Sequence, residues 1–335
     1  MGKSLPPKAI IGLGKFVWTT LWNLMMSNMA PRSKAGAYIR PDSQFRQRVA
    51  GSESSFPAQT QRYRLYVGLG CPWAHRTLVV RALKGLEEVV DVVVVQPSAT
   101  EGGWVFASPH QGCNRLGDLY QLAQPGYQGR STVPVLWDTH TQKIVNNESA
   151  EIILNLNSAF NELAQQPDLD LYPEALRSSI DQWNDKIYHA VNNGVYRCGF
   201  AQTQGAYDQA VNELFQTLDE LDQVLASHRY LCGDTLTLAD VRLFPTLFRF
   251  DVVYYGLFKC NRRRIQDYHY LGPYLRDLYQ LPGVADTCNL EAVKQSYYGF
   301  LFPLNPGGII PAGPDITCLS DPHGREVIGS AAQSL

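Results

Sequence analysis

Cys71 has the sequence context of a reactive cysteine. The alternation of apolar and polar residues over Arg62–Leu69 predicts a β-strand, and Gly68 and Gly70 indicate a turn after it. Because Pro72 favours the first turn of a helix, we expect Cys71 at a strand-to-helix junction beside free backbone N–H groups. These groups and the positive end of the helix dipole stabilise a thiolate, which is the nucleophilic form of the sulfur.

The neighbours of Cys71 limit the reaction that it can perform. Ala74 stands where a Cys-x-x-Cys motif would have its second cysteine. A mixed disulfide on Cys71 would therefore need an external thiol to resolve it. The alternative is a small buried cysteine, the commoner role of a free thiol, but the strand-to-helix position favours function.

The composition bounds the class of protein. A chain of 335 residues that is 45% hydrophobic is globular and long enough for two domains. A net charge of −2 gives no indication of a nucleic-acid partner. Seven cysteines without Cys-x-x-Cys pairs suit a reducing compartment, so we expect a cytoplasmic protein without a metal site.

The pattern over residues 58–165 predicts a small α/β domain. The elements expected after the Cys71 helix are a buried strand at Val89–Val95, strands at Ser131–Asp138 and Lys143–Asn147, and a helix at Ser149–Phe160. Pro134 inside the second of these strands marks a bend, a sheet edge or a cis bond. Trp104 lies in the predicted loop Glu101–Phe106, as a core anchor or a ligand platform.

Two polar residues precede the last of these helices. We expect Ser149 to be the N-cap, and such a helix start can hold a carboxylate. Simple helix capping also explains both Glu148 and Ser149.

Residues 166–335 predict an all-helical domain. The expected helices are Ala175–Asn193, Ala206–Ser227, Gly233–Phe250, Tyr270–Gln280 and Leu290–Tyr298. Thr237 and Asp240 have the spacing of a capping box, and the Gly- and Pro-rich tail Pro303–Leu335 favours an extended chain. Tyrosines recur among these helices. Most are expected to pack, and some could donate hydrogen bonds to an aromatic oxygen that gains charge.

Residues 1–57 predict an N-terminal extension. Ile10–Met29 is apolar and amphipathic, and the first acidic residue of the chain is Asp42. The uncharged run Phe16–Ala30 is too short to span a bilayer. The charge pattern allows a transit peptide or a membrane-surface helix, but we expect a helix packed on the body of the protein.

Several segments, in order over about residues 40–315, resemble the Xi class of glutathione transferases, the glutathionyl-hydroquinone reductases. They include CPWAHR, GGWVF, GRSTVPVLWD, IVNNESAEII, NNGVYRCGFA, RYLCGDTLTLADVRLFPTLFRFD and NPGGIIPAGP. The resemblance implies a thioredoxin-like N-terminal domain, an all-helical glutathione-transferase C-terminal domain and a homodimer. The implied reaction is the reductive removal of glutathione from glutathionylated hydroquinones.

The resemblance also implies roles for single residues. Cys71 matches the nucleophile, and Tyr196 and Tyr297 match the tyrosines on the hydroquinone side, with Tyr298 as the alternative to Tyr297. Ser296 departs from the family, in which His-Tyr-Tyr often stands at this place.

The implied glutathione site consists of Trp104, Arg130, Val133, Pro134, Glu148 and Ser149. In it the Val133 backbone, beside a cis Pro134, pairs with the cysteinyl backbone of the tripeptide. The γ-glutamyl ammonium lies at Glu148, and its carboxylate lies at the helix start. Arg130 reaches the glycyl carboxylate.

In the implied cycle, Cys71 attacks the thioether sulfur and releases the hydroquinone, and a second glutathione clears the resulting mixed disulfide. An omega-like thiol transferase or dehydroascorbate reductase would use the same cysteine without the tyrosines. A glutathione-conjugating transferase fits a cysteine less well. A non-catalytic glutathione-fold module and a protein anchored to a membrane through Ile10–Met29 are the alternatives from other classes.

Overall fold

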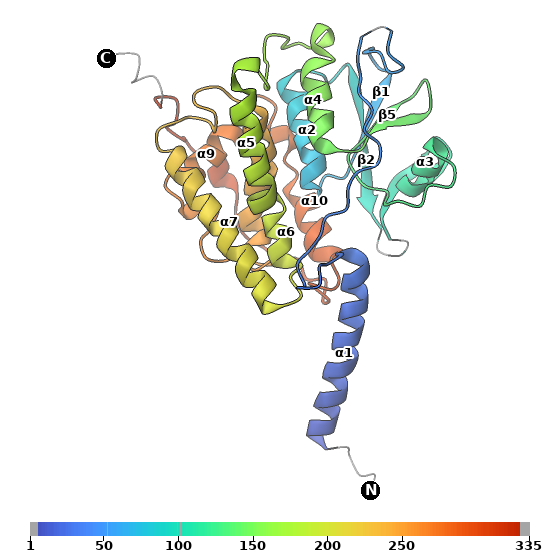
Figure 1. The fold of residues 1–335 in the computed structure, drawn as a ribbon, viewed down its shortest axis with the longest axis vertical. Helices are drawn as coiled ribbons and strands as arrows, with labels where there is room; N and C mark the ends of the chain where they lie inside the picture. The colour runs from blue at the N-terminus through green and yellow to red at the C-terminus, as the bar shows by residue number, and fades with distance from the viewer. Residues whose placement is uncertain (1–5, 52, 99, 101, 329–335) are drawn as a thin grey trace.

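The structure, a computed structural model, describes residues 6–328 except 52, 99 and 101. Residues 1–5 and 52 of the predicted extension, Glu101 of the predicted loop and residues 329–335 of the predicted tail lie outside this part. A sheet domain and a helical domain lie side by side, with α2 (Pro72–Leu83) and α4 (Ser149–Ser158) between the sheet and the other helices (Figure 1). The predicted α/β plus all-α fold class is confirmed.

The sheet has six strands in the order β4-β3-β2-β1-β5-β6. They are β1 (Tyr63–Val67), β2 (Val90–Pro97), β3 (Trp104–His110), β4 (Cys113–Arg115), β5 (Val135–Asp138) and β6 (Lys143–Asn146). β1 pairs in parallel with β2, and every other pairing in this sheet is antiparallel. Pro134 immediately precedes β5, so the strand starts only where the chain regains its N–H donors.

Two strands of this domain depart from the predictions. Trp104 begins β3 instead of lying in a loop, because Gly102 and Gly103, both with positive φ, turn the chain back so that Trp104 pairs with Pro97. β2 is only partly buried, and 40% of Val94 is exposed, since it lines an open groove beside residues 289–292. β4 and the helix α3 (Leu116–Ala123) were not predicted.

The five predicted helices are present in the helical domain. The helices of this domain are α5 (Arg177–Ile187), α6 (Gly194–Gly199), α7 (Gln204–Val224), α8 (Leu238–Arg249), α9 (Leu271–Tyr279) and α10 (Leu290–Lys294). Helix α8 starts at Leu238 instead of Gly233, because Thr237 caps it, and α6 was not predicted. Short 3₁₀ turns lie at Asn161–Leu163, Glu174–Leu176, Ile265–Asp267, Ala285–Thr287 and Thr317–Ser320. Three helices, α5, α8 and α10, run on into π-helical turns at Tyr188–Asn192, Phe250–Tyr254 and Gln295–Gly299.

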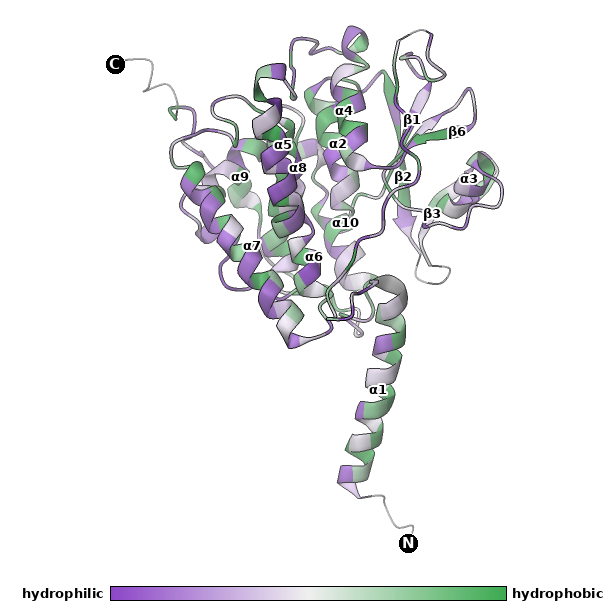
Figure 2. Ribbon diagram, in the orientation of Figure 1, coloured by the Kyte–Doolittle hydropathy of each residue, from purple (hydrophilic) through white to green (hydrophobic). Residues whose placement is uncertain are grey.

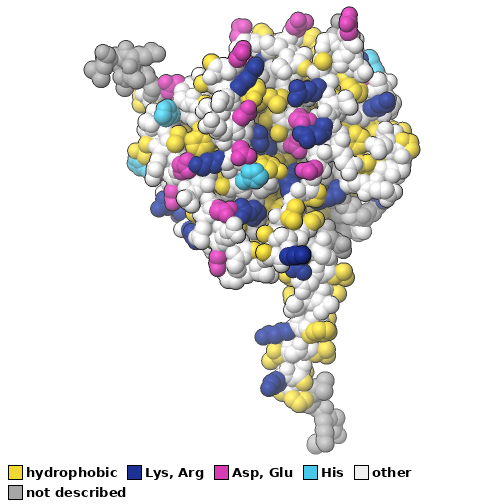
Figure 3. All heavy atoms as spheres, in the orientation of Figure 1, with side chains coloured by type: hydrophobic (Ala, Val, Ile, Leu, Met, Phe, Trp, Pro, Cys, Tyr) yellow, Lys and Arg dark blue, Asp and Glu magenta, His cyan; other side chains and the backbone are white. Residues whose placement is uncertain are grey.

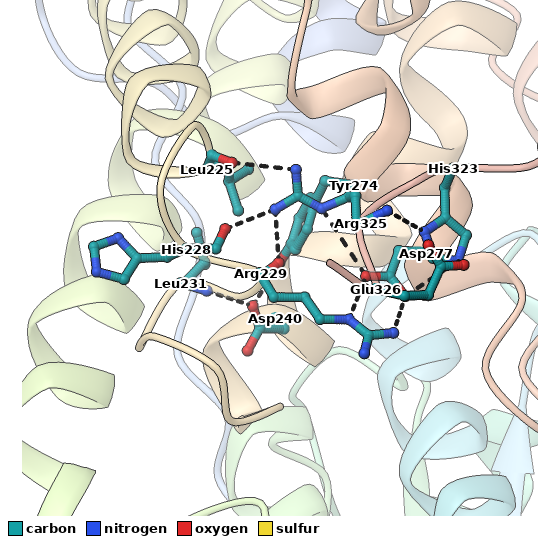
Figure 4. A network of polar contacts seen from close by, with 10 residues as sticks. All are labelled: Leu225, His228, Arg229, Leu231, Asp240, Tyr274, Asp277, His323, Arg325 and Glu326. Carbon is teal, nitrogen blue, oxygen red and sulfur yellow. Dashed lines mark hydrogen bonds and ion pairs between the residues drawn. The ribbon is translucent and has the colours of Figure 1, made fainter. Parts of the chain in front are cut away.

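The predicted capping box starts α8. The backbone N–H and the hydroxyl of Thr237 each donate to Asp240 Oδ2 over 2.9 Å. Over its described residues the tail is irregular, with turns near residues 304, 307 and 327 and one 3₁₀ turn at Thr317–Ser320, and buried Arg325 ties it to the helical domain. The Arg325 guanidinium donates to the carbonyls of Leu225, His228 and Arg229 (Figure 4).

The predicted packing of the N-terminal helix is wrong. Helix α1 (Pro7–Met29) projects from the body of the molecule (Figure 1), and Met26 and Ala30 at its base are the buried residues that join it to the core. Figure 2 shows apolar residues along its whole length. Among the described residues it is the one helix long and apolar enough to cross a membrane, over Pro7–Ser27.

Candidate active site

Cys71 is the N-cap of α2, at the turn that follows β1. Its N–H donates to the Gly68 carbonyl over 2.9 Å, and its half-buried Sγ lies 3.8 Å from the carbonyl oxygen of Val133. The Val133–Pro134 bond is cis, one of the three states that the sequence allowed. The turn thus holds the sulfur at the start of a helix, against the segment that leads into β5.

Two cavities meet at Cys71. The sheet-side cavity, about 380 Å³, is lined by residues 38–44, by Trp104 and by the segment Tyr127–Val133. The helix-side cavity, about 420 Å³, is lined by aromatic and small residues of the helical domain, namely Tyr196, Phe200, Ser296, Tyr297, Phe300 and Leu301. The sulfur can therefore face two parts of one substrate at once.

The structure brings together some of the predicted sheet-side residues and separates others. Trp104, Arg130 and Val133 line the sheet-side cavity with Cys71, whereas Glu148 and Ser149 line neither cavity. Asn147, immediately before them, is on the wall.

The N-cap of α4 is Glu148, so the prediction of Ser149 as the N-cap is wrong. Glu148 Oε1 accepts from the Ala150 N–H over 3.1 Å, and Oε2 accepts from the Ser43 hydroxyl over 3.0 Å. Ser149 is buried, and its Oγ accepts from the Arg76 guanidinium over 3.4 Å. The carboxylate takes the cap because its two oxygens accept from two donors, whereas the serine hydroxyl points inward.

On the helix side, three phenols form a chain. The hydroxyl of Tyr297 lies 2.5 Å from that of Tyr196 and 3.0 Å from that of Tyr254. Burial raises the pKa of all three phenols, and the charge of a Cys71 thiolate raises the pKa of Tyr196 and Tyr297 further. The phenols therefore stay protonated and can donate hydrogen bonds near the sulfur.

The structure settles which tyrosine of the pair faces inward. Tyr297 is buried in the cavity wall, whereas Tyr298 turns away and donates to the Val252 carbonyl over 3.2 Å. Tyr297 lies in the π-helical turn Gln295–Gly299, and Tyr254 ends the one at Phe250–Tyr254. Such turns often occur at functional sites.

Arg249 is a residue of this site that the sequence analysis missed. Fully buried at the end of α8, it donates to the carbonyls of Gly70 over 3.0 Å and Leu69 over 3.1 Å, directly before Cys71. A third bond, of 2.8 Å, joins its guanidinium to Nδ1 of His75. Burial and then the Arg249 charge lower the pKa of His75 well below its usual value, so the ring accepts as a neutral imidazole.

The N-terminal segment supplies another missed part of the site. The Gln47 N–H donates to the Val145 carbonyl over 2.9 Å, which places the preceding residues along the edge of the sheet. Tyr38 and Arg40 then line both cavities, and the Arg40 guanidinium lies 3.9 Å from the Trp73 ring centroid. Residues that we had assigned to an extension are therefore walls of the site.

Two glycines before Cys71 leave room for the side chains above them. A Cβ on Gly68 would lie 2.3 Å from the Trp104 ring, and one on Gly70 would lie 2.0 Å from the Ser296 hydroxyl. The absence of side chains at both positions therefore lets Trp104 and Ser296 pack directly against the turn that carries Cys71. Among the described residues there is no group of three His, Cys, Asp or Glu side chains that could hold a metal.

Comparisons with known proteins agree with this two-domain arrangement. The glutathione S-transferase N-terminal domain family matches residues 70–159, and the C-terminal domain family matches residues 204–279. The crystal structure of the glutathione-S-transferase Xi from Phanerochaete chrysosporium superposes with a TM-score of 0.81, at 46% identity, over 85% of this chain and 95% of that one. The glutathione-bound structure of YqjG from Escherichia coli superposes with a TM-score of 0.79, at 48% identity, over 84% and 96%. The fold is thus that of the glutathione transferases.

Curated relatives define the class further. Glutathionyl-hydroquinone reductase YqjG of Escherichia coli is 46% identical, over 93% of this chain and 97% of its own length. Glutathionyl-hydroquinone reductase PcpF of Sphingobium chlorophenolicum is 45% identical over 89% and 94%. Glutathione S-transferase omega-like 2 of Schizosaccharomyces pombe is 45% identical over 84% and 95%. The chain belongs to the Xi class of glutathione transferases, the family of the glutathionyl-hydroquinone reductases.

Proposed function

We propose that this enzyme reduces glutathionyl-hydroquinones to hydroquinones, with glutathione as co-substrate. The observation that carries the proposal is the position of Cys71 between a cavity with a cationic rim at Arg130 and a cavity walled by the phenols of Tyr196 and Tyr297. The first suits an anionic tripeptide, and the second suits an aromatic ring whose oxygens accept hydrogen bonds.

In the first step, the Cys71 thiolate attacks the sulfur of the thioether. A proton of the hydroquinone first moves from a ring oxygen to the carbon that bears sulfur, which gives the keto tautomer. An S–S bond then forms, the S–C bond breaks, and its electron pair moves through the ring onto the keto oxygen, which takes up a proton. The hydroquinone leaves, and the protein is left as a mixed disulfide with glutathione. Protonated phenols at Tyr196 and Tyr297 lower the barrier by donating to the ring oxygens as charge develops there.

In the second step, a glutathione thiolate attacks the mixed disulfide and releases oxidised glutathione and the Cys71 thiolate. One glutathionyl-hydroquinone and one glutathione thus give one hydroquinone and one oxidised glutathione. In the sheet-side cavity we assign the glycyl carboxylate to Arg130 and the cysteinyl backbone to Val133. Glu148 and the start of α4, adjoining the wall at Asn147, would hold the γ-glutamyl end.

A second candidate is an omega-like thiol transferase, because the fission-yeast relative carries that name. That reaction uses Cys71 and the sheet-side cavity but has no need of the phenols. The turnover of a glutathionyl-hydroquinone compared with that of a small mixed disulfide separates the two. Hydroquinone release that is lost in Cys71→Ser and kept in the control Cys318→Ser supports the reductase. Activity on the mixed disulfide alone would contradict the reductase and support the thiol transferase.

We also propose that the protein acts as a homodimer in the cytoplasm. The dimer is what the family resemblance implies, and the second step needs the free thiol of glutathione that a reducing compartment supplies. Light scattering should give twice the mass of one chain, and a single-chain mass would contradict the dimer.

A further inference from the structure

One face of the helix α1 is apolar without interruption. At about 100° per residue, Ile10, Leu13, Val17, Leu21 and Leu24 form a continuous stripe along it. Each of these side chains is 46–62% exposed. The helix therefore presents an apolar surface that the rest of the chain does not cover.

The opposite face of the helix carries positive charge. Lys8, Lys15 and Thr19 share this face with exposed Ile11, and Phe16 borders it. Every charged residue before Asp42 is a lysine or arginine. Figure 3 shows the lysines of the helix beside its apolar side chains. A second copy of this chain would bring the same charge, so this segment favours an anionic partner.

We propose that α1 lies on the surface of an anionic lipid bilayer, with its apolar stripe among the acyl chains. Trp18, which is 50% exposed, borders the stripe, where an amphipathic ring suits the interface between lipid and water. Lysines on the opposite face then reach the phosphates of the head groups. The proposal is independent of the reaction assigned to Cys71.

A position along the surface fits this helix better than one across the bilayer. The helical run without charge, Phe16–Met29, is about 21 Å long at 1.5 Å per residue, whereas the hydrocarbon core is about 30 Å thick. A spanning helix would also place Lys15 and Thr19 in hydrocarbon. On the surface, both stay in contact with water.

Docking through α1 would hold the active site close to the lipid. The chain from Ala30 to Tyr38 spans at most about 28 Å, and the residues from Tyr38 to Gln44 are part of the sheet-side cavity wall. The enzyme would therefore meet its substrate at the edge of a membrane.

The test uses the full chain and vesicles of phosphatidylcholine, with and without phosphatidylglycerol. Two variants add the same negative charge on opposite faces, Leu21→Glu in the stripe and Thr19→Glu on the face that carries the lysines. We expect sedimentation with phosphatidylglycerol vesicles that weakens with salt. Thr19→Glu should lose about fivefold in binding and Leu21→Glu about 100-fold. Equal unfolding temperatures of the three proteins show that both variants fold.

The other outcomes overturn the proposal. Failure of the full chain to bind, or equal losses in the two variants, would mean that the stripe does not enter lipid. Resistance to extraction by alkaline carbonate would mean that α1 spans the bilayer. A dimer in the absence of lipid that Leu21→Glu alone dissociates would mean that a second copy covers the stripe.

Discussion

The phenol chain sets the chemistry on the helix side of Cys71. Because burial raises the pKa of Tyr196, Tyr254 and Tyr297, all three keep their protons at neutral pH. Tyr297, in the middle, can donate to a substrate oxygen while it accepts from a neighbour. A ring that gains negative charge is therefore met by a donor whose own orientation is fixed.

Tyr297→Phe should lower kcat for a glutathionyl-hydroquinone by about 100-fold, the usual cost of losing a donor to developing charge. Tyr298→Phe is the matched control, since Tyr298 donates away from the cavity to the Val252 carbonyl. Its kcat should stay near the wild-type value. Steady-state kinetics of the two variants measures the difference, and equal losses would show that the phenol of Tyr297 has no special role.

Single residues were predictable where a local motif identified them. Cys71, Trp104, Arg130 and Val133 stand in recognisable segments, and the structure brings all four to the same cavity, although their roles remain predictions. Arg249 also stands in a recognisable segment, but nothing local indicated its role, because its partners at Leu69 and Gly70 lie about 180 residues away in sequence. Only tertiary packing shows that a buried arginine has the carbonyls before the cysteine as its acceptors.

At the scale of elements, α8 is fixed to the turn that carries Cys71. Arg249→Lys should lower kcat by about 10- to 100-fold, because an ammonium lacks the planar fork that binds both carbonyls and His75 at once, and the sulfur loses its position. The alkylation rate of Cys71 should fall as well.

Arg325→Lys is the control, since Arg325 is also buried and also binds backbone carbonyls, but in the tail (Figure 4). It should destabilise the protein without changing the alkylation rate. If both variants slow alkylation equally, Arg249 contributes only to general stability.

The capping box of α8 should contribute strongly to folding. Asp240 accepts from the backbone and hydroxyl of Thr237, from the Leu231 N–H and from the Tyr274 hydroxyl at 2.6 Å. In Asp240→Asn, an amide NH₂ group, which cannot accept hydrogen bonds, would face some of these donors. The free energy of unfolding should therefore fall by about 2–3 kcal/mol. Asp118→Asn in the exposed cap of α3 should cost about 1 kcal/mol. Urea titrations compare the two, and a larger loss for Asp118→Asn would contradict the role of burial.

Elements with strong periodicity were predictable, and their irregular ends were not. The Thr237–Asp240 box was visible in the sequence because both groups lie within one turn. The π-helical turns were not, since no local residue type requires them, and they decide that Tyr297 and not Tyr298 faces the cavity. β3 was not predicted because the glycines before it are typical of a loop, and its strand character depends on the pairing with β2.

At the scale of the molecule, a buried ion pair should make the sheet domain sensitive to acid. Arg62 binds both oxygens of Asp138, over 2.8 and 2.6 Å. Burial alone would raise the pKa of Asp138, but its bonds to Arg62, Thr141 and the His140 N–H bring the pKa below the usual value. The pair therefore stabilises the fold above pH about 4, and this contribution is lost as the pH falls through the lowered pKa.

Asp138→Asn should cost about 3–5 kcal/mol of unfolding free energy at pH 7 and less at pH 3, because below pH about 4 the carboxyl of the unfolded chain takes up a proton that the native carboxylate resists. Urea titrations at the two pH values measure both differences. A cost that is the same at pH 7 and pH 3 would contradict the linkage.

The arrangement of the whole chain was predictable only in part. The order of an α/β domain and a helical domain followed from the change in periodicity near residue 165. The path of residues 38–47 did not, because their contacts with the sheet edge and the cavities are long-range. The exposure of α1 was mispredicted because an apolar helix usually finds a partner within its own chain.

The most direct test of the central claim is the intact mass of the enzyme after it reacts with a glutathionyl-hydroquinone in the absence of free glutathione. The proposed mechanism predicts one glutathionyl group on Cys71 for each hydroquinone released. Added glutathione should remove this group as oxidised glutathione, and Cys71→Ser should show neither adduct nor hydroquinone. Hydroquinone release from an enzyme that carries no glutathionyl group on Cys71 would contradict the mechanism.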